Sequence, residues 1–263
     1  MTDRYAVIGH PISHSKSPEI HKLFAEQTGE DISYVAIEAP LDGFRETIER
    51  LRREGYKGCN VTVPFKFQAF EISGQRSERA KTAQAVNTLK FDGGIFGDNT
   101  DGAGLVRDIE KNLGVRLQGK RVLLMGAGGA SYGAALPLLQ THCLLTVANR
   151  TVEKAIRLAS AFDGVVPSNY ADLRGQQFDV IINATSSGLA DEMPDLPEAL
   201  FAEGALAYDM MYGRETPFMS FARASGARVA DGLGMLVEQA AEAFFIWRGT
   251  RPDTLPVIEK LRK

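Results

Sequence analysis

A glycine-rich turn between two apolar segments constrains this sequence more than any other feature. Residues 120–133 read KRVLLMGAGGASYG, and the short apolar run at 122–125 is typical of a buried parallel strand. Glycines follow at once: Gly126, Gly128 and Gly129. Glycine lets the backbone turn tightly and lets an anion come close, and the apolar residues at 134–139 predict a helix. Strand, glycine turn and helix form the context in which free N–H groups bind the pyrophosphate of a dinucleotide, although Ser131 replaces the third glycine of the usual motif.

The composition is that of a globular protein, and the 263 residues suffice for one large or two ordinary α/β domains. The net charge of −3 leaves no basic surface for nucleic acid. No apolar stretch approaches the roughly 20 residues of a membrane span, and the N-terminus lacks the apolar core of a signal peptide. We therefore expect a cytoplasmic protein with neither a nucleic-acid nor a membrane partner.

The two cysteines, Cys59 and Cys143, both lie in apolar runs that resemble strands. Such a pair matches neither a disulfide framework nor a metal-binding motif. We expect reduced core residues and no metal site.

Strand patterns alternate with helical patterns along the chain, which predicts an α/β fold with parallel sheets. The expected strands are at 5–9, 32–37, 58–64, 86–89, 95–97, 122–125, 144–148, 178–183, 205–209 and 228–230. Asp92-Gly93 is a hairpin signal, and a long apolar helix is expected at 236–247. Because the glycine turn opens a new unit in mid-chain, we expect two domains, the second of them Rossmann-like and doubly wound.

The residues after the second strand of the glycine-turn unit indicate which dinucleotide binds. An NAD-binding unit has an acidic residue there, which holds the ribose hydroxyls. This chain has Asn149, Arg150 and Thr151 instead, with Lys154 one helical turn further on. Because a guanidinium offers a fork of donors suited to a phosphate, we interpret Arg150 as a ligand of the 2′-phosphate of NADP. The alternative is a solvated surface arginine.

Polar side chains cluster where the strands of the first unit end. They are Ser13, His14, Ser15, Ser17, Thr62, Lys66, Asn87 and Asp101. Ligands of open parallel sheets bind at the carboxyl ends of the strands, so these groups are expected to converge. Hydroxyls, an amide, a carboxylate and an ammonium suit a small polyhydroxylated acid. The alternatives are that each is a turn or cap residue, and that Lys66 and Asp101 form a surface ion pair.

Short motifs occur along the whole chain in a characteristic order. They are GHPISHSKSP at 9–18, NVTVPFK at 60–66, AVNTL at 85–89, GDNTDG at 97–102, GAGGA at 126–130, NRT at 149–151, NAT at 183–185, DMMY at 209–212 and DGLGML at 231–236, followed by Gln239. In this order they resemble the motifs of the shikimate dehydrogenase family, over about residues 5–249. Two positions depart from the family pattern: His10 stands where Asn is frequent, and Tyr132 stands where Arg is frequent.

The resemblance implies a reversible, NADPH-linked reduction of 3-dehydroshikimate to shikimate, in the chorismate and aromatic amino acid pathway. Lys66 and Asp101 match the family's catalytic pair. Substrate-binding positions are matched by Ser15, Lys16, Ser17, Thr62, Lys66, Asn87, Asp101, Tyr212 and Gln239. Cofactor-binding positions are matched by Glu78, Gly126, Ala127, Gly128, Gly129, Ala130, Asn149, Arg150, Thr151, Lys154, Met210 and Gly232.

The resemblance also implies that the C-terminal helix packs back on the first domain. The substrate-binding and catalytic domain would then be residues 1–101 plus 237–263, and the NADP-binding domain would be residues 102–236. Gln239 agrees with this, because it shares a helical face with the apolar Leu236, Ala243 and Ile246. A polar group on such a face needs a partner, and a substrate hydroxyl would serve.

Three other functions compete with this interpretation. A quinate/shikimate dehydrogenase using NAD is disfavoured by Asn149 and Arg150. A methylenetetrahydrofolate dehydrogenase is disfavoured by the loop that carries Ser13, Ser15 and Ser17, called the serine loop below. A non-catalytic nucleotide sensor is disfavoured by Lys66 and Asp101, because a sensor has no need of a proton donor. The expected partner is a small-molecule substrate, and the expected state is a monomer or homodimer.

Overall fold

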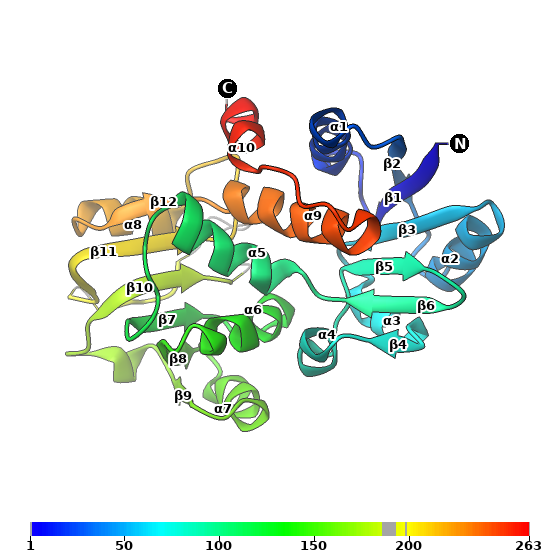
Figure 1. Cartoon of the computed structure of the whole chain (residues 1–263). Helices are drawn as coiled ribbons and strands as arrows, with labels where there is room; N and C mark the ends of the chain where they lie inside the picture. Colours follow the sequence, from blue (N-terminus) through cyan, green and yellow to red (C-terminus); the bar gives the residue numbers. More distant parts are fainter. Residues whose placement is uncertain (1, 186–192, 198, 263) are drawn as a thin grey trace. The chain divides into compact units, whose positions relative to one another are not determined.

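The chain divides into two compact units, each with a six-stranded sheet. In this computed structural model, residues 2–185, 193–197 and 199–262 are described (Figure 1). The first unit comprises Met1–Gly104 and Val237–Lys263, and the second comprises Leu105–Leu236. The two sheets are separate, so no continuous sheet joins the hairpin of the first unit to the glycine-turn strand of the second.

The sheet of the first unit is mixed. Its strands are β1 (Asp3–Gly9), β2 (Ile32–Glu38), β3 (Tyr56–Val61), β4 (Gln75–Arg76), β5 (Thr88–Phe91) and β6 (Ile95–Asp98), in the order β2-β1-β3-β5-β6-β4. β1 runs parallel to β2 and β3, as predicted, but β5 is antiparallel to both β3 and β6. The sheet is therefore parallel from β2 to β3 and antiparallel from β3 to β6, and the antiparallel part includes the predicted hairpin. The tight turn predicted at Asp92-Gly93 reverses the chain, and Gly93 adopts a φ of 66° there.

Helices cover both faces of this sheet. They are α1 (Ser17–Thr28), α2 (Phe44–Arg53), α3 (Lys66–Ile72), α4 (Glu78–Ala83), α9 (Leu233–Arg248, of which Val237 onward belongs to this unit) and α10 (Leu255–Leu261). α2, α3 and α4 pack their apolar residues on one face, against Ala6, Ile8 and Leu89. On the opposite face, Trp247 of α9 stacks on Tyr5 of β1 with ring centroids 4.6 Å apart.

The sheet of the second unit is entirely parallel. Its strands are β7 (Arg121–Met125), β8 (Leu144–Ala148), β9 (Val165–Ser168), β10 (Phe178–Asn183), β11 (Phe201–Asp209) and β12 (Arg228–Ala230), in the order β12-β11-β10-β7-β8-β9. Every described pair of neighbours is parallel, so the carboxyl ends of all these strands lie along one edge. The order reverses at β7, which is the switch point where ligands of doubly wound sheets bind.

Helices also lie on both faces of the second sheet, as a doubly wound fold requires. They are α5 (Asp101–Arg107, of which Leu105 onward belongs to this unit), a π-helical turn (Asp108–Asn112), α6 (Gly129–Gln140), α7 (Val152–Ala161), a 3₁₀ turn (Ala171–Leu173) and α8 (Pro217–Ala224). α6 and α7 pack with Val122 and Leu124 on one face of β7, whereas α8 packs with Leu123 and Met125 on the other. The four apolar residues of β7, 122–125, are fully buried, which confirms the strand predicted from the continuous apolar run.

Within the described ranges, no helix is both long and apolar enough to span a membrane. The same ranges hold no group of three His, Cys, Asp or Glu side chains arranged for a metal ion. Cys59 and Cys143 are buried and carry free thiols, as predicted for core residues.

Candidate active site

Lys66 and Asp101 form an ion pair in the first unit, with 2.6 Å between Nζ and Oδ2. Each is the first residue of a helix, Lys66 of α3 and Asp101 of α5. Their side chains are 30% and 13% exposed, so the pair is mostly enclosed but still reaches solvent. The N–H of Val86 donates to the carbonyl of Lys66 at 3.0 Å, which ties the start of α3 to the segment leading to Asn87. An ammonium held in this way can give or take a proton at a defined place.

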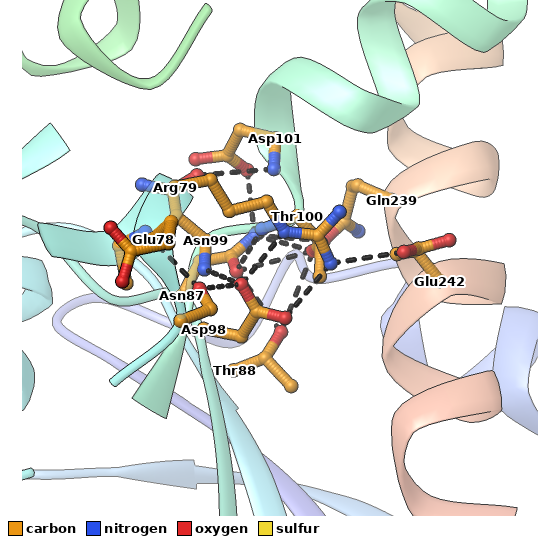
Figure 2. Close-up of polar contacts among 12 residues, drawn as sticks. Glu78, Arg79, Asn87, Thr88, Asp98, Asn99, Thr100, Asp101, Gln239 and Glu242 are labelled. Atoms are coloured by element: carbon orange, nitrogen blue, oxygen red, sulfur yellow. Dashed lines mark hydrogen bonds and ion pairs between the residues drawn. The ribbon is translucent and has the colours of Figure 1, made fainter. Parts of the chain in front are cut away.

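Asn87 is buried and lies among the polar residues around Asp101 (Figure 2). Its amide nitrogen donates to Asp101 Oδ1 at 2.8 Å and to Thr100 Oγ1 at 2.9 Å. It also lies 3.3 Å from Gln239 Oε1 on α9. The amide oxygen accepts the backbone N–H of Thr100 at 2.8 Å, which fixes which end of the amide faces Asp101. The structure thus brings together four of the residues singled out from the sequence: Lys66, Asn87, Asp101 and Gln239.

The serine loop and the loop after β3 lie side by side. A Cβ on Gly9 would meet the Thr62 side chain at 2.5 Å, and the N–H of His10 donates to the carbonyl of Val63 at 3.0 Å. Ser15 Oγ accepts the N–H of Ser17 at 3.3 Å at the start of α1. Lys16, between them, is half-buried. Ser17 is buried and its side chain is hydrogen-bonded to Tyr34, whereas Ser15 is half-buried. No hydrogen bond in the described part of the chain joins these serines to the Lys66–Asp101 pair.

Sequence reasoning missed three buried polar residues that support Asn87. They are Asn60, Thr88 and Thr100. Thr88 Oγ1 donates to Asn87 Oδ1 at 3.0 Å and accepts from Asn60 Nδ2 at 3.0 Å. Each stands inside a motif already noted for its neighbours. A threonine or asparagine on a strand (Asn60 and Thr88) or just after one (Thr100) was the available signal, because buried polar side chains need partners.

The glycine turn of the second unit has the geometry that an anion requires. Gly126 adopts a φ of 99°, where a side chain would be strained. A Cβ on Gly128 would meet nothing within 4 Å, so open space lies over the N-cap of α6. Ser131 is fully buried and donates its hydroxyl to the carbonyl of Gly126 at 2.8 Å. Serine thus replaces the third glycine by linking the turn to the helix, and the first N–H groups of α6 stay free for a pyrophosphate.

Arg150 follows β8 and is exposed, with no hydrogen bond or ion pair to any described residue. Asn149 Nδ2 donates to the carbonyl of Thr151 at 2.9 Å, and Thr151 is the N-cap of α7. Lys154 is exposed one turn further on. Two exposed cations at a helix start suit a ribose phosphate.

Met210 and Gly232 lie just after β11 and β12, at the carboxyl-end edge of the second sheet. The N–H of Gly232 donates to the carbonyl of Met211 at 2.9 Å, and a Cβ on Gly232 would overlap the Met210 carbonyl. Only glycine allows that approach. Tyr212, after β11, is half-buried, and burial raises the pKa of its phenol. Glu78, in the first unit, is exposed and forms an ion pair of 2.6 Å with Lys81, so the structure adds no feature to single it out as a cofactor residue.

The donors of the second unit therefore fit a dinucleotide with a phosphate on its ribose. The chain combines a doubly wound sheet, which has a glycine turn and an exposed arginine after β8, with an enclosed lysine–aspartate pair. This combination defines an NADP-dependent oxidoreductase.

Family models cover most of the chain. Residues 7–89 match the shikimate dehydrogenase substrate binding domain, residues 108–190 match shikimate / quinate 5-dehydrogenase, and residues 232–262 match the shikimate 5′-dehydrogenase C-terminal domain. The chain belongs to the shikimate dehydrogenase family.

Relatives and solved structures agree with this membership. The NADP(+) shikimate dehydrogenase of Methylobacillus flagellatus is 60% identical, over 99% of each chain. The crystal structure of an Ael1 enzyme from Pseudomonas putida is 52% identical with a TM-score of 0.96, covering 99% of this chain and 98% of that one. A Thermus thermophilus shikimate 5-dehydrogenase, solved in complex with NADP(H) and shikimate, is 35% identical with a TM-score of 0.89, over 99% of each chain.

Proposed function

We propose that this protein catalyses the reversible, NADPH-linked reduction of 3-dehydroshikimate to shikimate. The observation that carries the proposal is the 2.6 Å contact between Lys66 and Asp101, held by Asn87. The family membership of the chain and the names of its relatives support it. We further propose that the protein acts in the cytoplasm, in the pathway to chorismate and the aromatic amino acids.

Lys66 acts as the general acid of the reduction. NADPH, when bound, supplies the hydride. The oxygen of the substrate ketone gains negative charge as the hydride arrives, and an ammonium beside it can donate a proton at the same time. In the reverse direction the neutral amine accepts that proton. Asp101 holds the ammonium in place through Oδ2 while its Oδ1 is held by Asn87.

The remaining polar residues bind and orient the substrate. Asn87 and Gln239 present amides toward the ring hydroxyls, with Asp101 as a second acceptor. The hydroxyls of Ser15, Ser17 and Thr62, together with Lys16 and Tyr212, bind the substrate carboxylate and its neighbouring hydroxyl groups. Because all of these groups are neutral or singly charged hydrogen-bonding groups, they suit a hydroxylated acid better than an apolar substrate.

The second unit binds NADP. The turn from Gly126 to Ala130 receives the pyrophosphate, and Asn149, Arg150, Thr151 and Lys154 bind the adenosine ribose and its 2′-phosphate. Met210 and Gly232 line the nicotinamide end, and Glu78 of the first unit is proposed near the same ring. Residues 1–101 with 237–263 then act as the substrate-binding domain, and residues 102–236 act as the NADP-binding domain.

Absorbance assays of the full chain test the proposal. Purified protein is mixed with shikimate or quinate, and with NADP or NAD, in all four combinations. Rapid formation of NADPH with shikimate and NADP is expected, with much slower reactions in the other three mixtures. Comparable rates with NAD would favour a quinate/shikimate dehydrogenase, and NADP binding without turnover would favour a nucleotide sensor.

A further inference from the structure

Arg79, on α4, bridges two carboxylates that lie far apart in the sequence (Figure 2). Its Nε and Nη2 donate to the two oxygens of Asp98 at 2.7 and 2.8 Å, and Nη2 also donates to Glu242 on α9 at 2.9 Å. The Arg79 side chain is 23% exposed, and those of Asp98 and Glu242 are 7% and 18% exposed. Arg79 therefore connects the end of β6 to the middle of α9 inside the first unit.

One end of the bridge fixes the turn that carries Asp101. Asp98 ends β6, three residues before Asp101. Besides Arg79, its carboxylate accepts the hydroxyl of Ser77 and the backbone N–H of Asn99, the latter at 2.7 Å. Asn99 Oδ1 in turn accepts the N–H of Asp101 at 3.2 Å. A change in the position of the Asp98 carboxylate is thus passed along hydrogen bonds to the start of α5.

The other end of the bridge fixes the helix that carries Gln239. Glu242 lies three residues after Gln239, so both residues face the same side of α9. Glu242 also accepts a hydrogen bond from Arg251. Burial acts to raise the pKa of Glu242, but its hydrogen bonds and ion pairs with Arg251 and Arg79 outweigh burial and hold that pKa below its usual value. Burial likewise acts to lower the pKa of Arg79, and Asp98 and Glu242 reverse the effect.

We propose that Arg79 is a positioning residue, whose bridge between Asp98 and Glu242 sets the distance of Asp101 from Gln239. This inference rests on the proposed function. Among the described residues, the hydrogen bonds and ion pairs of Arg79 go to Asp98 and Glu242 and not to Lys66 or Asp101, so we expect it to act through the turn and the helix. A partly buried ion-pair network contributes little net stability once its desolvation cost is counted, but it imposes a particular geometry. The forked guanidinium suits this role, because a lysine ammonium cannot hold one carboxylate bidentately and reach a second.

The test compares Arg79→Gln with a matched control, Arg248→Gln. Arg248 also ties α9 to the sheet of the first unit, through Glu30 and Asp3, and its side chain is 22% exposed. It lies at the far end of the helix from Gln239. Steady-state kinetics with shikimate and NADP are measured for both variants, together with urea unfolding.

Arg79→Gln is expected to lower kcat/KM for shikimate by about 10- to 100-fold, the effect of a misplacement of about 1 Å. Its KM for NADP is expected to stay close to that of the wild type. Arg248→Gln is expected to lose stability without changing either kinetic constant. Wild-type kinetics in Arg79→Gln, or equal kinetic losses in both variants, would overturn the proposal. Turnover by the wild-type chain tests the proposed function separately, because the inference concerns only the ratio of kcat/KM in the variant to kcat/KM in the wild type.

Two further variants keep the test decisive if Arg79→Gln folds poorly. Glu242→Gln breaks the charge pair from the helix side, and Arg79→Lys keeps the charge but loses the fork. Both are expected to lower kcat/KM for shikimate, Arg79→Lys less than Arg79→Gln. In the double variant Arg79→Gln/Gln239→Ala, the two losses should combine to less than their product, because Arg79 acts partly through Gln239. Independent losses would show that α9 does not transmit the effect.

Discussion

Asn87 and Gln239 lie 152 residues apart in the sequence and 3.3 Å apart in the first unit, between Nδ2 and Oε1. The contact depends on α9 packing on the face of the sheet that carries Tyr5, where Trp247 stacks and donates its N–H to the carbonyl of Leu89 at 3.0 Å. From Val237 onward, α9 therefore belongs structurally to the N-terminal sheet. A polar side chain from the end of the chain is placed by a tryptophan two turns further along the same helix.

We expect Gln239→Ala to weaken shikimate binding and to leave NADP binding intact. Losing the amide leaves a substrate hydroxyl without its partner, which costs about 1–3 kcal/mol, or about 5- to 150-fold in affinity. Calorimetric titration with each ligand measures this directly. Glu46→Ala, on the outer face of α2, serves as the control. Unchanged shikimate affinity in Gln239→Ala would remove Gln239 from the binding site.

Lys66→Ala should lower the turnover number by about 10²- to 10⁴-fold, because that is the usual contribution of a general acid or base. Shikimate and NADP should still bind, since other side chains make most of the hydrogen bonds. Steady-state kinetics with direct binding measurements separate the two effects. Lys22→Ala, which removes an exposed lysine paired with Glu26, is the matched control. Near-normal turnover combined with lost affinity would make Lys66 a binding residue.

The sequence predicted the parts of this site that depend on local patterns. The apolar run of β7, the glycine turn and the Asp92-Gly93 hairpin each have a signal within a few residues, and each is confirmed. The strand β9 was missed because Pro167 argues against a strand. It is tolerated there because β9 is at the edge of its sheet, where the missing N–H costs no ladder bond.

Two other features had no local signal. α3 was missed because a seven-residue helix that buries only Ala69 shows no apolar stripe. The bridge from Asp98 through Arg79 to Glu242 was missed for a different reason. Ion pairs between distant segments leave no periodicity in a sequence, and charged residues are usually solvated.

Arg150→Ala should raise the KM for NADP by about 10- to 100-fold and change that for NAD little. The reason is the loss of charge-assisted hydrogen bonds to the 2′-phosphate, which are worth about 1.5–3 kcal/mol. Initial rates with both cofactors test this, with Arg157→Ala on the helix α7 that follows Arg150 as the control. Equal losses for NADP and NAD would show that Arg150 does not recognise the phosphate.

His21 should make the fold sensitive to acid. It is fully buried on α1, its ring is stacked on Tyr34 with centroids 4.1 Å apart, and neither ring nitrogen has a well-aligned hydrogen-bond partner among the residues described. Burial lowers the pKa of His21 from 6.5 to about 3, and nearby Asn60 offsets only part of this.

In the folded state His21 therefore stays neutral until the pH approaches 3, whereas in the unfolded chain it gains a proton below about pH 6.5. Protonation of the unfolded state favours unfolding. His21 therefore lowers the free energy of unfolding only below about pH 6.5, and the effect grows as the pH falls toward 3. The expected loss of unfolding free energy is about 1.4 kcal/mol per pH unit, or about 2 kcal/mol at pH 5.

In His21→Phe, whose ring can occupy the same aromatic stack, that part of the pH dependence of stability should disappear. Urea unfolding of both proteins at pH 8 and pH 5 measures it. The difference in unfolding free energy between variant and wild type should shift by about 2 kcal/mol in favour of the variant on acidification. An equal difference at both pH values would mean that His21 is protonated in the folded state as readily as in the unfolded chain.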